Sequence, residues 1–272
     1  MRILFFGDVV GEIGLRAIER DLSTLKKKLD ADFVIVNGEN TCKGSGLTYK
    51  EYEAFVNAGV DCITLGNHWH GRDQIDDYIQ EADHLVRPLN LKGFVRGEGS
   101  SIFYSNGVFI QVTNILGQAF MKEAVDDPIE SFESLLDETD PSEACLIHFV
   151  DFHADSTSEK KIFVEKFAGR VSAVIGTHTH VQTADETIIN GTGYLTDCGY
   201  CGAANSIIGY TPSSVLSVLV DKEPGKFKVD IEGPVELDCV LIEIDENTGR
   251  CLSIEPMRII EGKEIQHATH DL

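Results

Sequence analysis

The stretch Val171-Ser172-Ala173-Val174-Ile175-Gly176-Thr177-His178-Thr179-His180 decides the fold class of this chain. An apolar run rich in Val and Ile that ends at a glycine is typical of a buried strand followed by a loop. His178 and His180 are two residues apart, so a strand end or a tight loop can direct both rings at one point. Imidazole is the commonest transition-metal ligand. The stretch therefore predicts a buried strand with metal-binding side chains at its carboxyl end.

The length and composition favour one α/β domain over residues 1–272, although two small domains would also fit. Hydrophobic residues make up 42% of the chain, enough for a sizeable core. No apolar run approaches the roughly 20 residues needed to cross a bilayer. The short apolar run at the N-terminus is followed directly by Gly7-Asp8, and not by the small-residue cleavage site of a signal peptide. We interpret it as a first strand and expect a cytoplasmic protein.

The charge balance limits the partners. The chain has 23 Lys and Arg against 45 Asp and Glu, a formal net charge of -22. Such a surface repels long nucleic acids and anionic membranes. The negative charge does not exclude a small anionic substrate, because a bound metal ion can make the electrostatic potential positive at its own site. We therefore expect no long nucleic acid and no membrane as partners, keep a small anionic substrate, and leave a homo-oligomer open.

The seven cysteines are scattered and odd in number, which fits a reduced cytosolic chain better than a disulfide framework. Cys198 and Cys201 have CxxC spacing, and a redox or metal role is open for them. No second CxxC completes a zinc site, and no helix-opening context indicates a thioredoxin-type motif. We interpret the pair as two ordinary small residues in a loop.

Apolar periodicity predicts an alternation of strands and helices over the first 180 residues. Strands are expected at 2–6, 33–36, 62–65, 108–112, 145–150 and 171–175. Helices are expected at 15–29, from an N-cap at Thr48 to Asn57, at 73–81, and from Ser156 or Thr157 to Phe167.

After His180 the pattern changes to antiparallel hairpins. One is expected over 187–196 with its turn at Asn190-Gly191, and another pairs 235–244 with 251–260. Units of strand and helix followed by antiparallel strands indicate two sheets with helices outside.

Metal-ligand side chains follow five of the predicted strands. Sites in open α/β sheets lie beyond the carboxyl ends of the strands. The segments found there are Gly7-Asp8, Asn37-Gly38-Glu39-Asn40, Gly66-Asn67-His68, Asp151-Phe152-His153, and His178 with His180. Singly, each has a structural explanation: a helix cap, turn residues or a core histidine. Together, these carboxylates, amides and imidazoles predict a site for Fe, Mn or Zn.

These segments resemble the calcineurin-like metallophosphoesterases, and most closely their bacterial YmdB-like branch. The resemblance spans roughly residues 1–210. The segments that carry it beyond the strand ends above are Val9-Val10-Gly11, Arg87-Pro88-Leu89-Asn90, Thr157-Ser158-Glu159-Lys160, residues 176–186, Gly191-Thr192-Gly193-Tyr194 and Thr196-Asp197. The resemblance implies an α/β fold, the four-layer αββα metallophosphoesterase sandwich of two mixed sheets flanked by helices.

The resemblance also implies a centre of two divalent transition metals, with Fe or Mn favoured and Zn as a third choice. The implied ligands of the first metal are Asp8, Glu39, Asn40 and His180. The implied ligands of the second metal are Glu39, Asn67, His153 and His178, so that Glu39 bridges the two. The superfamily usually has Asp-x-His at the first motif, but Val10 stands in place of that histidine here, and the branch pattern puts Asn40 in its role.

His68 corresponds to the catalytic histidine of the family. The branch usually has a Trp two residues after it, followed by an acidic residue, whereas this chain has His68-Trp69-His70-Gly71. The Trp is displaced by one place and the acid is missing. This departure concerns the substrate pocket and not the ligands, and His70 is either a pocket residue or a surface residue.

The implied chemistry is hydrolysis of a phosphate ester. Two metals roughly 3.5–4 Å apart can share a hydroxide and bind a phosphoryl oxygen. Asp8 and Glu39 supply two negative charges, so two divalent ions leave the centre at about +2, which can bind a phosphate. As a general acid, His68 would contribute roughly 10²–10⁴-fold.

We therefore predict a metal-dependent phosphodiesterase that hydrolyses 2′,3′-cyclic nucleotides through a two-metal-activated hydroxide. The cyclic-nucleotide substrate follows from the resemblance alone. The alternatives are a phosphomonoesterase, a nuclease on short RNA, or a non-catalytic regulatory protein that binds a nucleotide. The intact His68 and a ligand set with open positions favour catalysis.

Overall fold

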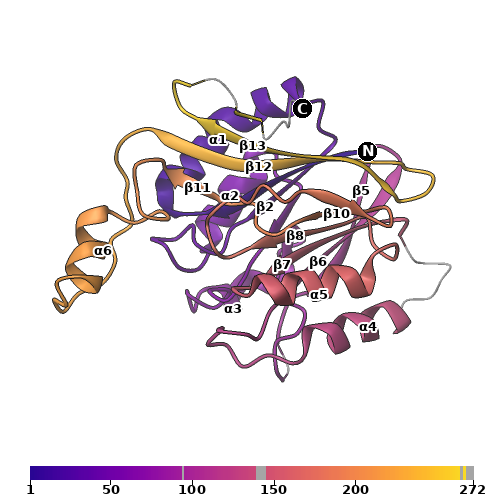
Figure 1. The fold of residues 1–272 in the computed structure, drawn as a ribbon, viewed down its shortest axis with the longest axis horizontal. Coiled ribbons are helices and arrows are strands. Elements are labelled where there is room, and N and C mark those ends of the chain that lie inside the picture. Colours follow the sequence, from indigo (N-terminus) through magenta and orange to yellow (C-terminus); the bar gives the residue numbers. More distant parts are fainter. Residues whose placement is uncertain (94, 139–144, 264–265, 268–272) are drawn as a thin grey trace.

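The fold is described from a computed structural model covering residues 1–93, 95–138, 145–263 and 266–267. Two sheets face each other (Figure 1). The larger sheet has the order β14 (Gln266–His267), β13 (Cys251–Ile260), β12 (Val235–Ile244), β11 (Tyr200–Ala203), β1 (Arg2–Val9), β2 (Phe33–Asn37), β3 (Cys62–Thr64) and β4 (Leu85–Val86). The smaller sheet has the order β5 (Ser100–Ser105), β6 (Val108–Leu116), β7 (Ile147–His153), β8 (Ala173–Thr177), β10 (Thr192–Leu195) and β9 (Thr187–Ile189).

Helices cover the outer faces of both sheets. On the larger sheet lie α1 (Gly11–Lys28) and α2 (Tyr49–Ala58), followed by the short α3 (Ile75–Tyr78) and the 3₁₀ turn η1 (Ile79–Glu81). On the smaller sheet lie α4 (Pro128–Glu138) and α5 (Thr157–Phe167). Helix α6 (Pro212–Leu219) projects away from the layers (Figure 1).

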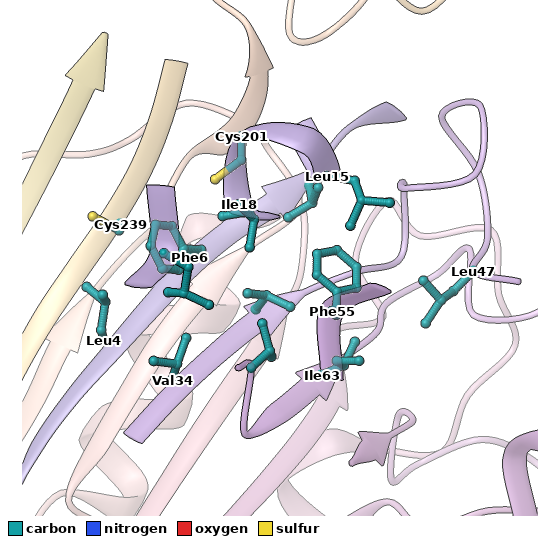
Figure 2. Close-up of a cluster of buried hydrophobic side chains, with 14 of the residues drawn as sticks. Leu4, Phe6, Leu15, Ile18, Val34, Leu47, Phe55, Ile63, Cys201 and Cys239 are labelled. Atoms are coloured by element: carbon teal, nitrogen blue, oxygen red, sulfur yellow. The ribbon is translucent and has the colours of Figure 1, made fainter. Parts of the chain in front are cut away.

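Alternation along β1 shows how the sequence produces these layers. Leu4 and Phe6 pack with the helices on the outer face, as Figure 2 shows, whereas Ile3 and Phe5 point into the space between the sheets. Successive side chains of a strand point to opposite faces, so a strand apolar at every position is buried on both sides. The central cluster continues into the smaller sheet through residues such as Phe149, whose ring centroid lies 5.0 Å from that of Phe5.

Both sheets are mixed. In the larger one, β1 runs parallel to β2 and β11 and antiparallel to β12. In the smaller one, β6, β7, β8 and β10 are parallel, and β5 and β9 are antiparallel edge strands. The predicted fold class, two mixed sheets flanked by helices, is confirmed. The assignment of the whole chain to a single domain stays a prediction.

Several predicted elements are confirmed, and some boundaries are wrong. The hairpin over 187–196, the pairing of 235–244 with 251–260, and the caps at Thr48 and Ser156 are present. Helix α1 begins at Gly11 and not at residue 15. Glycine has a low helix propensity, so the glycines in the first turn of α1 gave no helical signal in the sequence. A Cβ on Gly14 would collide with the Cys201 carbonyl, so close packing against β11 requires that glycine.

The expectation of one helix over 73–81 is wrong. Tyr78 has a φ of -130° where α3 ends, and its buried ring packs beside Tyr49 and Tyr52. Strands β7 and β8 each begin and end two or three residues later than predicted. Their last residues are polar but buried, so counting apolar residues alone placed these strands too early.

The interpretation of the CxxC pair as loop residues is right for Cys198, which lies in the loop before β11, and wrong for Cys201, which is part of β11; both side chains are buried. Each thiol faces a backbone carbonyl, that of Phe5 for Cys198 and that of Asp238 for Cys201. Burial raises the pKa of both thiols well above the ordinary value. All seven cysteines lie within the described residues and are free.

No described helix is long and apolar enough to cross a membrane.

His148 on β7 gives the fold a pH dependence. The side chain is buried and hydrogen-bonded to Thr113, and burial lowers the pKa of His148 to about 3. Between about pH 6.5 and pH 3, the unfolded chain binds a proton at this position that the folded chain does not. The free energy of unfolding therefore decreases as the pH is lowered through this range. From pH 6.5 to pH 4.5, we expect the free energy of unfolding of the His148→Gln variant to decrease by about 2 kcal/mol less than that of the unmodified chain. Denaturant unfolding at both pH values checks this, with the exposed His70→Gln as control. An equal loss in His148→Gln and the unmodified chain would contradict it.

Candidate metal centre

The two sheets bring the seven predicted ligands to one place. Asp8 lies near the end of β1, and Glu39 and Asn40 follow β2. Asn67 follows β3, His153 ends β7, and His178 and His180 follow β8. Because the parallel strands of both sheets point the same way, their carboxyl ends meet at a common edge.

One group of ligand atoms surrounds Nε2 of His153. This nitrogen lies 3.3 Å from Oε1 of Glu39, 3.0 Å from Oδ1 of Asn67 and 3.1 Å from Nδ1 of His178. The ligand atoms of Glu39, His153 and His178 all lie within 4.8 Å of one another. This is the group predicted for the second metal.

The second group lies around Nε2 of His180. This nitrogen is 3.7 Å from Oδ1 of Asp8 and 3.2 Å from Nδ2 of Asn40, which also donates to Oε1 of Glu39 at 3.0 Å. For Asn40 to offer its oxygen to an ion, Oδ1 and Nδ2 of its amide must exchange places. This exchange leaves the shape of the side chain nearly unchanged. This is the group predicted for the first metal.

The chemistry of the ligand cluster fits a bound cation. Oδ1 of Asp8 is buried and has no hydrogen-bond partner among the described residues, although a buried carboxylate oxygen needs one. Burial raises the pKa of Asp8 for the same reason. A cation between Asp8 and His180 would satisfy this oxygen.

The neighbouring charges lead to the same conclusion. Burial acts to lower the pKa of His153, but Glu39 and Asp8 raise it to about 9. Burial also acts to raise the pKa of Glu39, but His153 and His68 hold it well below its ordinary value. Burial and the neighbouring His153 lower the pKa of His178 to about 3, so His178 is neutral and can offer a lone pair. The cluster thus attracts positive charge.

The turn that carries the two histidines is strained. His178 and His180 have φ values of 101° and 60°, in a region that side-chain-bearing residues rarely adopt. The backbone N–H of His178 donates to Oδ2 of Asp8 at 3.0 Å. Nδ1 of His180 lies 2.9 Å from the carbonyl oxygen of Ile208, and its ring stacks on Tyr200. The turn is therefore fixed from several directions.

A buried ion pair beneath this turn was missed by sequence reasoning. Lys160 and Asp197 are both fully buried, with Nζ 2.9 Å from Oδ2. Lys160 also donates to the carbonyl of Thr177 at 2.9 Å, and Asp197 accepts from the backbone N–H of Thr179 at 3.1 Å. Both residues lie in segments of the family resemblance, but nothing in the sequence pairs α5 with the residues after β10.

His68 lies at the edge of the ligand cluster with its side chain 39% exposed. Its Nδ1 is 2.7 Å from Oδ1 of Asn40 and 3.5 Å from Oε1 of Glu39. Its backbone N–H donates to the other oxygen of Glu39 at 2.8 Å. The hydrogen bond between the ring of His68 and the carboxylate of Glu39 raises the pKa of His68, while partial burial opposes this shift. Its remaining ring nitrogen, Nε2, has no partner among the described residues.

The two residues after His68 have different surroundings. His70 is exposed and pairs with Asp76 at 2.8 Å, which makes it a surface residue, whereas Trp69 packs against the core. Gly66 lies against the cluster, and a Cβ there would collide with Oε2 of Glu39 and with the ring of His153. The glycine is required for the close approach of backbone and ligands.

Comparison with known proteins gives consistent results. A family model described as YmdB-like protein matches residues 4–257. A protein of Bacillus subtilis (strain 168) named 2′,3′-cyclic-nucleotide 2′-phosphodiesterase is 39% identical over 260 residues, which cover 95% of this chain and 97% of that protein.

Two solved structures share the fold and much of the sequence. A structure described as a novel phosphatase from Mycoplasma pneumoniae has a TM-score of 0.89 and 38% identity, covering 96% of this chain and 93% of that one. A structure described as a hypothetical protein from Thermus thermophilus has a TM-score of 0.88 and 35% identity, covering 96% of this chain and 100% of that one.

Proposed function

The chain belongs to the YmdB-like protein family, and on this premise we propose that it is a metal-dependent phosphodiesterase acting on 2′,3′-cyclic nucleotides. Relatives named phosphodiesterase and phosphatase make the chain a phosphoesterase. The observation that carries the finer proposal is the convergence of two ligand groups on Glu39, with the partly exposed His68 beside them.

The residues that would hold the metals follow from the two groups. Asp8, Glu39, Asn40 and His180 would hold one ion, and Glu39, Asn67, His153 and His178 the other. When bound, two divalent ions lower the pKa of water toward about 7 and offset the charge of a phosphoryl group. Nitrogen and oxygen ligands in this mixture suit Fe or Mn, with Zn as a third choice.

The ligand charges favour a phosphate anion. Asp8 and Glu39 are the only carboxylates in the proposed set, and the asparagines are neutral. Two carboxylates do not cancel the charge of two divalent ions, so the centre attracts an anion despite a net charge of -22.

His68 would protonate the leaving oxygen. Asn40 and Glu39 bind its Nδ1 side, so Nε2 is the nitrogen free to face a substrate. A positioned acid of this kind contributes roughly 10²–10⁴-fold. In a 2′,3′-cyclic nucleotide the 2′ oxygen would leave toward His68, and the product would be the 3′-phosphate. The name of the Bacillus subtilis relative supports this direction of cleavage.

The substrate class can be tested by steady-state kinetics on three compounds. A cyclic nucleotide carries one phosphate, which can sit wholly on the metals, whereas a long RNA brings further phosphates toward an acidic surface. We expect kcat/KM for 2′,3′-cyclic AMP to exceed the values for adenosine 3′-monophosphate and for an unstructured RNA oligomer by at least about tenfold. A higher value for the monoester or the oligomer would favour the phosphomonoesterase or the nuclease. No turnover of any of them by the metal-loaded chain would favour a regulatory protein.

A further inference from the structure

A chain of buried hydrogen bonds runs from Asn37 to the ligand His153. Nδ2 of Asn37 donates to Oδ2 of Asp151 at 2.9 Å, and the hydroxyl of Thr177 donates to Oδ1 of Asp151 at 2.6 Å. The same hydroxyl oxygen lies 2.9 Å from Nδ1 of His153. Asn37, Asp151, Thr177 and His153 are all fully buried, so no solvent competes for these bonds.

Backbone groups fix the orientation of Asn37. Its Oδ1 accepts from the backbone N–H of Glu39 at 3.2 Å, and its Nδ2 donates to the carbonyl of Leu65 at 3.0 Å. A backbone N–H can only donate and a carbonyl can only accept, so the amide cannot be turned over without losing both bonds. Asn37 therefore presents a donor to Asp151, and the hydroxyl of Thr64 presents a second one at 2.5 Å.

This orientation sets the direction of every later bond. Because Oδ2 of Asp151 faces donors, the carboxylate acts as an acceptor, and its Oδ1 takes the single proton of the Thr177 hydroxyl. The Thr177 oxygen must then accept from Nδ1 of His153. With a proton held on Nδ1, Nε2 is the nitrogen of His153 that faces the space shared with Glu39, Asn67 and His178, and it offers a lone pair there when an ion replaces the proton on it.

We propose that Asn37, Asp151 and Thr177 are positioning residues that hold His153 in its Nδ1-protonated form, with Nε2 ready to bind the second metal. The inference rests on the proposed metal-dependent function. Partners of this kind on a ligating histidine typically change metal affinity 10–100-fold. Asn37 also holds the backbone of Glu39, so one buried network orients ligands from both sheets.

Two substitutions test the direction of the chain. Thr177→Val removes the hydroxyl and leaves Nδ1 of His153 without a partner. In Asp151→Asn, the new amide oxygen would face Asn37 and Thr64, so its NH₂ would donate to Thr177, and Thr177 would donate to Nδ1. His153 would then keep its proton on Nε2, where it blocks metal binding. We expect the second Mn²⁺ to bind 10–100-fold more weakly in both variants.

The readout is direct titration of the chelator-treated full chain with Mn²⁺, following the free ion by EPR, with no substrate present. Thr177→Ser keeps the hydroxyl and should restore the affinity. Thr113→Val is a matched control, because Thr113 makes a buried bond of 2.8 Å to another histidine of the same sheet, His148. It should lower the unfolding temperature but leave both Mn²⁺ affinities unchanged.

The titration separates this inference from the proposed function. Unmodified chain that binds two Mn²⁺, with Thr177→Val and Asp151→Asn binding both as tightly, would overturn only the positioning role. That role would also be overturned if Thr177→Ser were as weak as Thr177→Val, or if Thr113→Val lost the second ion. Unmodified chain that binds no Mn²⁺ would overturn the metal-dependent function together with the inference.

Discussion

Replacing Glu39 with glutamine is expected to deplete at least one metal and to reduce turnover by about 10³-fold or more. Glu39 is 1% exposed, and its Oε1 lies near Nε2 of His153 and accepts from Asn40. The change removes one of the two negative charges proposed to face the metals. It also puts an NH₂ group, which cannot bind a cation, at one of the two oxygen positions.

The measurement is metal content per chain together with kcat/KM on 2′,3′-cyclic AMP. Glu19→Gln is the control, because it makes the same change on the exposed face of α1. Full metal occupancy and normal activity in Glu39→Gln would contradict the bridging role.

The second large effect is expected for His68→Ala, which should keep both metals and lose roughly 10²-fold or more in turnover. His68 touches the ligands Asn40 and Glu39, but its free Nε2 lies on the partly exposed side of the ring. The loss should be smaller for a p-nitrophenyl phosphodiester, because p-nitrophenolate leaves without protonation. His70→Ala is the control, since His70 is a surface residue paired with Asp76.

Steady-state rates on both substrates and metal analysis of each variant check this expectation. Equal losses for the good and the poor leaving group would count against His68 as the acid. Loss of metal from His68→Ala would instead make it a residue that supports Asn40 and Glu39.

The layers of the fold were predictable because they depend on local patterns. Runs such as 33–36 and the turn at Asn190-Gly191 carry their own signal, and the structure places a strand and a hairpin there. The short strands β4 and β11 and the helices α4 and α6 were not predicted. A strand such as Leu85–Val86 is too short for periodicity, and its place depends on pairing with β3.

The ligand candidates were also predictable, because strand ends are visible in the sequence and parallel strands bring their ends together. Their assignment to two metals stays a prediction. The contacts that support them were not predictable. Asn37 and Asp151 are 114 residues apart, and Lys160 and Asp197 are 37 apart. Each residue looks like an ordinary polar position until the sheets pack and burial removes its access to water.

The most direct test of the account is the hydrolysis of 2′,3′-cyclic AMP by metal-depleted chain as Mn²⁺ is added back. Two ligand groups that share Glu39 predict that activity rises with added metal, levels off at about two equivalents per chain, and yields adenosine 3′-monophosphate. Activity that levels off at one equivalent, or turnover that persists without metal, would contradict the two-metal phosphodiesterase.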